Sequence, residues 1–282
     1  MSSIALQFRI VASAIAATFG ALLAFTAAAA ECAVTSGTQR VAVLELFTSE
    51  GCDSCPPADK WVSELPARKL DVDRVIPLAF HVDYWNQLGW IDPFSQAAFS
   101  DRQRQHSQRR GVTFVVTPQL LLNGQDYRRA VLFDDIDGKV GAINRTKPQA
   151  NIRIAINNRG SALDSTADVS VPGTIDQRRA QVYIALYENN LITAVKAGEN
   201  KGHTLKHDFV VRKLVGPLGL DAKGGLSHAQ SFPLDARWKP QDMRLAVFVQ
   251  HPQSGEVLQA LSAACQPLPR NTLPARFPAL EP

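Results

Sequence analysis

Two hydrophobic patterns follow each other along the 282-residue chain. Over about residues 40–147, apolar runs of strand length alternate with longer amphipathic segments, a pattern typical of α/β proteins. The predicted strands cover 41–47, 75–80, 119–122 and 127–130, and the predicted helices cover 58–65, 93–110 and 133–145. Asn123-Gly124 predicts a hairpin turn between the last two strands, because both residue types tolerate positive φ. We therefore expect an α/β domain with the order β-α-β-α-β-β-α.

The second pattern contains strand-length segments without intervening helices. A linker at about 145–149, which includes Pro148, separates it from the first. The predicted strands cover 151–156, 167–171, 181–187, 244–250 and 256–261. Turn residues separate them at intervals typical of an antiparallel sandwich. We therefore expect an all-β sandwich-like domain at 148–265 and a Pro-rich tail at 266–282.

The first thirty residues resemble a signal peptide. Arg9 precedes the long apolar stretch Ile10–Phe25, and the small residues Ala27–Ala30 suit cleavage by a signal peptidase. The alternative is a retained membrane anchor, because the stretch is nearly long enough to span a bilayer. We favour cleavage, which predicts a periplasmic or secreted protein with no membrane span after signal removal.

The charge of the chain gives no reason to expect nucleic acid as a partner. Its formal net charge is +4, and removal of Arg9 with residues 1–30 leaves +3. The basic stretch Arg102–Arg110 has no accompanying motif or row of stacking aromatic residues. We interpret this stretch as the solvated face of a helix.

Four cysteines remain after the leader. Cys52 and Cys55 form a close CxxC pair, whereas Cys32 and Cys265 lie near the two ends of the mature chain. An unpaired thiol is a liability in an exported protein, so we predict a structural Cys32–Cys265 disulfide, although the sequence does not determine connectivity.

The CxxC pair lies between a predicted strand and a predicted helix. Pro56-Pro57 follows it, and proline is tolerated in the first turn of a helix. Cys52 is therefore placed at a helix N-terminus, where the helix dipole favours the reactive thiolate, whereas the neighbouring Asp53 opposes thiolate formation. We predict a redox site in which Cys52 is exposed.

This arrangement resembles the thioredoxin superfamily over about residues 40–147. The resemblance implies a thioredoxin-like α/β domain in which Cys52 attacks, Cys55 resolves, and Pro118 faces the pair as a cis-proline. It also implies that the backbone of Thr117 pairs with a substrate. The segments 46–59, 81–85 and 117–119 are more narrowly similar to a family of secreted bacterial proteins catalogued as domain of unknown function 1223.

Two positions differ from thioredoxin itself. Gly51 stands where thioredoxin has a tryptophan, and Leu46 stands where it has a buried acid that assists proton transfer. Glu45 is adjacent but should point to the opposite face of the strand. We therefore do not expect a buried acid at this position to assist proton transfer during thiol–disulfide exchange.

Polar and aromatic residues outside the CxxC pair are candidates for binding a client. His81, Asp83, Tyr84 and Trp85 follow the second predicted strand, and we predict that they contact substrate; the alternative is that they only pack the loop. The polar segment 198–207 has two interpretations. It is either a plain surface loop, which we favour, or a segment whose Glu199, Asn200 and His207 contact the redox domain or its client.

Thiol–disulfide exchange with protein clients is the function that the sequence favours. It requires no cofactor, and a membrane redox partner would supply or remove electrons. The alternative is a periplasmic copper-binding or copper-delivery protein that uses Cys52, Cys55 and His81, with Asp83 as a further ligand. A third interpretation is an interaction module that has lost catalysis. Structural zinc is disfavoured because only one close cysteine pair exists.

Overall fold

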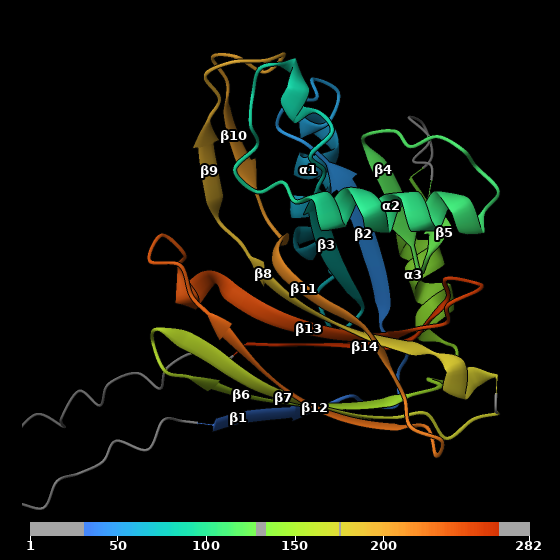
Figure 1. The fold of residues 1–282 in the computed structure, drawn as a ribbon. Helices are drawn as coiled ribbons and strands as arrows, with labels where there is room; N and C mark the ends of the chain where they lie inside the picture. The colour runs from blue at the N-terminus through green and yellow to red at the C-terminus, as the bar shows by residue number, and fades with distance from the viewer. Residues whose placement is uncertain (1–30, 128–133, 175, 265–282) are drawn as a thin grey trace, which may run out of the picture.

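The computed structural model of the chain describes residues 31–127, 134–174 and 176–264. Within these ranges the fold is a mixed α/β structure with three α-helices, an eight-stranded mixed sheet and a four-stranded antiparallel sheet (Figure 1). The helices are α1 (Pro56–Ser63), α2 (Ala97–Arg109) and α3 (Ile136–Asn144). Short 3₁₀ helices lie in the connections at Pro66–Arg68, Asn86–Leu88, Gln177–Arg179 and Pro240–Asp242.

The eight-stranded sheet has the order β14-β13-β8-β11-β3-β2-β4-β5. Its strands are β2 (Ala42–Thr48), β3 (Val75–His81), β4 (Gln119–Leu122), β5 (Gln125–Asp126), β8 (Gln181–Glu188), β11 (Val210–Gly219), β13 (Met243–Gln250) and β14 (Val257–Ala263). The four-stranded sheet contains β1 (Glu31–Thr35), β6 (Asn151–Asn158), β7 (Ala162–Ser170) and β12 (Gly225–Pro233). A separate hairpin pairs β9 (Leu191–Ala194) with β10 (Thr204–His207).

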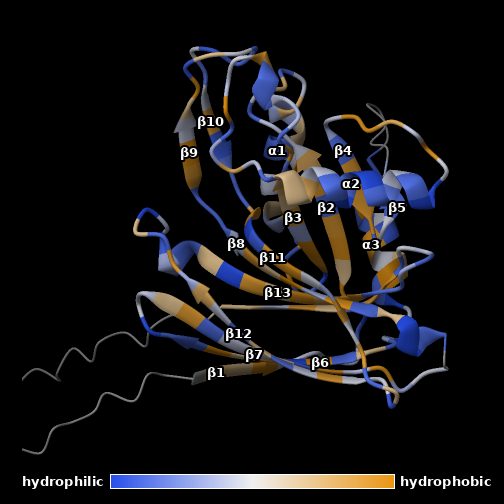
Figure 2. Cartoon of the chain, in the orientation of Figure 1, coloured by the Kyte–Doolittle hydropathy of each residue, from blue (hydrophilic) through white to orange (hydrophobic). Residues whose placement is uncertain are grey.

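The centre of the large sheet follows the hydrophobic runs of the sequence. Every residue of β2 and β3 is buried, and the two strands pair in parallel, as expected for strands covered on both faces. Figure 2 shows hydrophobic residues concentrated along these strands. The predicted hairpin is confirmed: Asn123 and Gly124 both have positive φ between β4 and β5. Gly124 is required there for a second reason, because a Cβ on it would lie 2.0 Å from the Gly255 carbonyl oxygen.

The large sheet continues from the first part of the chain into the second. β11 pairs in parallel with β3, with Val210 opposite Ala79, and β8, β13 and β14 extend the sheet from there. Strands from both sides of residue 148 therefore share one sheet, and the structure shows no division into domains. The boundary that we placed at 148 stays a prediction.

The sandwich-like part of the prediction corresponds to the four-stranded sheet packed against β8 and β13. Along β8, Val182, Ile184 and Leu186 face the hydrophobic core between these sheets. The alternate residues Tyr183 and Tyr187 face the core shared with β2 and β3. The nearly continuous apolar run of the sequence at 181–187 thus reflects a strand buried on both faces, which is one reason why the two parts are continuous.

Helix α2 corrects the interpretation of the basic stretch as a solvated face. Figure 2 shows that α2 is largely polar, yet Arg102 and His106 are buried. The Arg102 guanidinium donates two hydrogen bonds to Glu45 on β2, at 2.6 and 2.8 Å. It also stacks on the rings of Tyr183 and Phe248, which come from β8 and β13. A buried ionic partner on the sheet therefore holds a polar helix in place.

Several predicted elements differ at their ends. The predicted helix at 93–110 begins only at Ala97, because Asp92 accepts hydrogen bonds from the backbone N–H groups of Phe94 and Ser95 in a preceding turn. The predicted strand at 127–130 falls mostly on residues 128–130, which lie outside the described residues, as do the predicted signal peptide and the tail at 266–282. Among the described residues, no helix is long and apolar enough to cross a membrane.

Candidate functional site

The CxxC pair lies where the sequence predicts it, between β2 and α1. Cys52 and Cys55 form a disulfide, and Cys55 is the N-cap of α1, with Pro56 in the first turn. The backbone N–H of Ala58 donates to the Cys55 carbonyl at 2.8 Å, which starts the helix. None of the described cysteines is a free thiol. Cys265 lies outside the described residues, so the Cys32–Cys265 disulfide stays a prediction.

The expectation that Cys52 is exposed is wrong for this structure. Cys52 and Cys55 are both 0% exposed, although the flanking Asp53 and Ser54 lie at the surface. The CxxC turn has hydrogen-bond partners far away in the sequence, Glu199 and Asn200, and the local pattern around the CxxC pair did not predict its burial. Because both cysteines are buried, an attacking thiol reaches either sulfur only after neighbouring groups move.

The segment between β9 and β10 contacts the CxxC turn. The Asn200 side-chain amide donates hydrogen bonds to the carbonyl oxygens of Glu50 and Cys52, both at 2.9 Å. Glu199 accepts a hydrogen bond from the backbone N–H of Asp53 at 3.0 Å. The favoured interpretation of 198–207 as a plain surface loop is therefore wrong, and the alternative is confirmed in that Glu199, Asn200 and His207 contact residues 50–53. We call the segment 191–207 the capping hairpin.

Glu50 connects the capping hairpin to the loop after β3. Its carboxylate contacts the His207 ring (Oε1 to Nε2, 3.1 Å) and accepts a hydrogen bond from the Trp90 indole at 2.9 Å. Its backbone N–H donates to Asp92 at 2.8 Å. Glu50 is itself buried. These contacts fix the turn that leads into Cys52 from two sides.

His81 lies at the end of β3 and is fully buried. Its Nδ1 lies 2.7 Å from Asp92 Oδ2. Burial alone would lower the pKa of His81, but the adjacent Asp92 carboxylate outweighs this effect and raises the pKa. Burial acts in the opposite direction on Asp92, and the His81 ring outweighs it and lowers the pKa of that carboxyl. His81 therefore holds the loop 83–92 in place, which was the alternative to a client contact.

The side chains of Asp83, Tyr84 and Trp85 are each occupied by contacts within the protein. Asp83 accepts a hydrogen bond from the Ser100 hydroxyl, and the Tyr84 hydroxyl donates to Gln103 at 3.1 Å. The Trp85 indole donates to the Thr117 hydroxyl at 2.7 Å. These contacts pack the loop against α2 and the segment before β4. Client binding by these residues stays a prediction.

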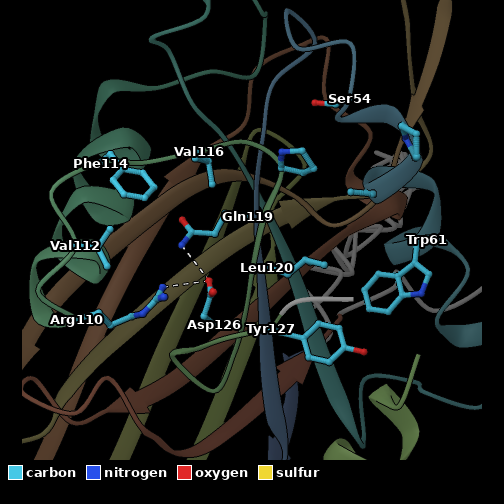
Figure 3. A pocket seen from close by; sticks show the side chains of 13 residues that line it. Ser54, Trp61, Arg110, Val112, Phe114, Val116, Gln119, Leu120, Asp126 and Tyr127 are labelled. Atoms are coloured by element: carbon cyan, nitrogen blue, oxygen red, sulfur yellow. Dashed lines mark hydrogen bonds and ion pairs between the residues drawn. The ribbon is translucent and has the colours of Figure 1, made fainter. Parts of the chain in front are cut away.

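Pro118 lies beside the CxxC turn, as the thioredoxin resemblance implies. The Thr117–Pro118 peptide bond is cis, and Gln119, the next residue, pairs with Phe47 of β2. Pro118 and Ser54 line the same groove, which has a volume of about 430 Å³ (Figure 3). The apolar wall of this groove is open to solvent, since Phe114 is 67% exposed and Val116 is 49% exposed.

Comparison with known proteins places the chain in a family. A family model described as a protein of unknown function (DUF1223) matches residues 43–250. The chain belongs to the DUF1223 family. None of the curated proteins compared with the chain matches it.

Two solved structures share the fold of this DUF1223 protein. The first is AtR35, a structural genomics target from Agrobacterium tumefaciens, with 24% identity and a TM-score of 0.58, covering 81% of this chain and 96% of that one. The second is HBP35 of Porphyromonas gingivalis, with 15% identity and a TM-score of 0.61, covering 86% of this chain and 82% of that one. Both similarities concern the fold alone.

Three acidic residues of the site were not singled out from the sequence of the DUF1223 protein. Glu50 and Asp59 flank the CxxC pair, and Asp92 lies in the loop after β3. All three are buried, and burial raises the pKa of Asp59. The proximity of Glu50 and Asp59 to the cysteines was an available signal. Their burial was not, because the residues that contact Glu50, His207 and Trp90, lie far from it in the sequence.

Leu46 is the residue that the thioredoxin resemblance places at the position of the buried acid. Leu46 is part of the hydrophobic core, and Glu45 points to the face that carries α2, where it binds Arg102. The copper alternative of Cys52, Cys55 and His81 stays a prediction. In this structure the two sulfurs are bonded to each other, and His81 groups instead with Asp59 and His207.

Proposed function

We propose that this DUF1223 protein exchanges thiols and disulfides with protein clients through Cys52 and Cys55. The observation that supports this most is the position of the Cys52–Cys55 disulfide, at the N-terminus of α1 and beside a groove that contains Pro118. The N-terminus of a helix stabilises a thiolate, which is the nucleophile in exchange.

In the reduced protein, the Cys52 thiolate attacks one sulfur of a client disulfide. A Cys52–client bond forms and the other client sulfur leaves as a thiolate. The Cys55 thiolate then attacks Cys52 Sγ, which forms the Cys52–Cys55 bond and releases the second client thiolate. Two electrons pass from the protein to the client. In the oxidised protein the same steps run in reverse, and the client becomes oxidised.

The groove next to Ser54 is the proposed place for the client chain. Its open apolar wall, with Phe114 and Val116, suits a peptide that carries apolar residues next to its cysteine. The buried disulfide requires that Asn200 first releases the CxxC turn. Exchange is therefore coupled to displacement of the capping hairpin in this proposal.

The proposal also includes an exported location, periplasmic or secreted, and a membrane redox partner that renews the Cys52–Cys55 couple. No cofactor takes part in the exchange steps. The client and the direction of electron flow depend on the reduction potential of the couple, which can be measured by equilibration with glutathione.

The test uses the mature protein in its reduced form and a disulfide-bonded peptide with apolar flanking residues. Wild-type protein should reduce the peptide, and Cys55→Ser should accumulate a mixed disulfide that mass spectrometry detects. Cys52→Ser should form no such adduct, because it lacks the attacking sulfur. Equal adduct formation by both single variants, or no exchange by folded wild-type protein, would contradict the proposal.

A further inference from the structure

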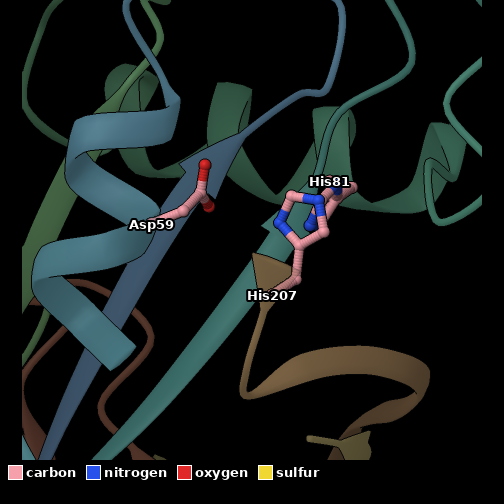
Figure 4. Close-up of side chains that lie close together, drawn as sticks. All are labelled: Asp59, His81 and His207. Atoms are coloured by element: carbon pink, nitrogen blue, oxygen red, sulfur yellow. The ribbon is translucent and has the colours of Figure 1, made fainter. Parts of the chain in front are cut away.

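A second group of chemically active side chains lies beside the CxxC pair. Asp59 of α1, His81 of β3 and His207 of β10 lie together, with one potential ligand atom from each within 4.8 Å of the others (Figure 4). Their exposed fractions are 7%, 0% and 2%. Three elements that are far apart in the sequence thus contribute one residue each to a buried polar cluster.

Both histidine rings have one nitrogen engaged and one without a partner. His81 uses Nδ1 to contact Asp92, and His207 uses Nε2 to contact Glu50. The remaining nitrogens, His81 Nε2 and His207 Nδ1, are buried and have no hydrogen-bond partner among the described residues. A buried polar atom without a partner costs free energy, so an unpartnered nitrogen on each histidine of this cluster indicates a missing ligand.

The surroundings of the cluster have the form found around metal ligands. A ligating histidine usually contacts a carboxylate through its other ring nitrogen, which fixes the ring orientation. Asp92 and Glu50 occupy this position for His81 and His207. The Thr48 hydroxyl similarly orients Asp59 by donating to Oδ2 at 3.0 Å. Each of the three candidate ligands therefore has a hydrogen-bonding group behind it.

The charge of the cluster also favours a cation. Glu50, Asp59 and Asp92 are all buried, and His81 contacts Asp92 while His207 contacts Glu50. Two imidazole nitrogens and one carboxylate oxygen suit zinc and its first-row neighbours, whereas calcium and magnesium prefer oxygen ligands alone.

We propose that Asp59, His81 and His207 form a site for a divalent first-row transition metal, with Zn²⁺ as its best probe. Ligand atoms about 2.0–2.1 Å from zinc lie about 3.4 Å apart in tetrahedral geometry, so the three side chains would close inward by about 1 Å. Three protein ligands leave a fourth position for water or another ligand. The site does not depend on the proposed exchange reaction.

The position of the site gives the metal a structural consequence. His207 is at the end of the capping hairpin, whereas Asp59 lies one helical turn after Cys55, on the helix that the CxxC pair begins. A metal bound to both would connect the hairpin to the helix that carries the disulfide. Its occupancy would thereby favour the covered form of the Cys52–Cys55 pair.

The test measures Zn²⁺ binding by calorimetry to oxidised, chelator-treated mature protein, without thiol reagents. We expect one Zn²⁺ per chain with micromolar or tighter affinity. Asp59→Asn and His207→Ala should each weaken binding at least tenfold. His203→Ala is the matched control, because His203 lies in the same hairpin but is exposed, and it should bind as wild type does. Circular dichroism verifies that each variant is folded.

Two further measurements identify the ligands. Cobalt substitution should give the visible spectrum of a four-coordinate site with nitrogen and oxygen ligands and no sulfur-to-metal charge transfer. The double variant Cys52→Ser/Cys55→Ser should retain Zn²⁺ binding.

The proposal is overturned if folded wild-type protein binds no stoichiometric Zn²⁺, if Asp59→Asn binds normally, or if loss of the cysteines abolishes binding. Because Zn²⁺ binding is measured on protein whose disulfide is closed or replaced by serines, failure of thiol exchange would leave a positive result unaffected.

Discussion

Asn200 illustrates how much of the site depends on one side chain. Its amide group donates to two backbone carbonyls of the CxxC turn, and the residue is buried. A buried carbonyl that loses its partner costs about 1–3 kcal/mol, so this side chain stabilises the covered state of the disulfide considerably.

Replacement of Asn200 by alanine should therefore expose the disulfide more often. We expect Asn200→Ala to increase the rate of Cys52–Cys55 reduction by dithiothreitol about tenfold, as measured by thiol trapping under native conditions, because about 1.4 kcal/mol changes an equilibrium tenfold. Asn151→Ala, an exposed change on β6, is the control and should leave the rate unchanged. An unchanged rate in Asn200→Ala would show that other contacts keep the disulfide covered.

At this scale the sequence predicted the position of the CxxC pair better than its surroundings. The CxxC spacing and the strand before it placed Cys52 and Cys55 between a strand and a helix, and the thioredoxin resemblance gave Pro118 as a cis-proline. Glu50 and Asp59 were missed because an acidic residue near a turn usually faces solvent. In the structure, His207 and Trp90 contact the Glu50 carboxylate, and the Thr48 hydroxyl donates to Asp59.

Helix α2 shows how a polar element is held against the large sheet. Arg102 contacts Glu45 on β2 and Gln250 on β13, and it stacks on aromatic rings from two further strands. The bidentate geometry satisfies the guanidinium in an environment where an unpaired charge would be costly.

Removal of this arginine should destabilise the whole protein. Arg102→Met leaves the Glu45 carboxylate buried without its partner, and we expect a loss of about 3–5 kcal/mol in the free energy of unfolding. Urea denaturation measures the loss. Arg104→Met, on the exposed face of the same helix, is the matched control and should cost less than about 1 kcal/mol. A small effect in Arg102→Met would mean that packing alone holds α2.

The same ion pair predicts a loss of stability in acid. Burial alone would raise the pKa of Glu45, but Arg102 and His106 outweigh it and hold that pKa well below the ordinary value. A depressed folded-state pKa contributes stability that is complete above about pH 4.3 and declines as the pH falls below it. Thermal unfolding should therefore shift to lower temperature below that pH, and the shift should be smaller in a Glu45→Gln/Arg102→Met variant.

The elements that the sequence missed have weak or interrupted patterns. β11 contains Gly216-Pro217 and a register irregularity against β8, so its apolar residues do not form a clean strand signal. β9 and β10 are only four residues long each, and their alternation is short. By contrast, β2, β3, β4 and β13 are continuous apolar runs, and the sequence placed them within a residue or two.

The molecule as a whole is organised around a sheet that crosses the expected domain boundary. Local periodicity identifies strands but not their partners, so the sequence could not predict that β11 pairs with β3. The two hydrophobic cores share β8, which presents alternate residues to each. Separate folding of the two parts would therefore leave a core surface uncovered on each.

This continuity can be tested by truncation. A polypeptide of residues 31–147 lacks β11, so the edge of β3 and part of its core would be exposed. We expect it to aggregate or to lack a cooperative thermal transition, whereas residues 31–264 should unfold cooperatively. A well-folded 31–147 polypeptide, judged by dispersed amide signals in nuclear magnetic resonance, would instead support the domain boundary at 148.

The cover over the Cys52–Cys55 bond also affects how fast any reagent can react with it. If sulfur is reached only after the capping hairpin lifts, lifting becomes the slow step once the attacking thiol is abundant. The observed rate of reduction then reaches a maximum as the thiol concentration rises. This maximum equals the rate at which the hairpin lifts, so it is the same for chemically different thiols. The rate of disulfide reduction would then depend on the opening rate of the capping hairpin more than on the reducing power of the thiol.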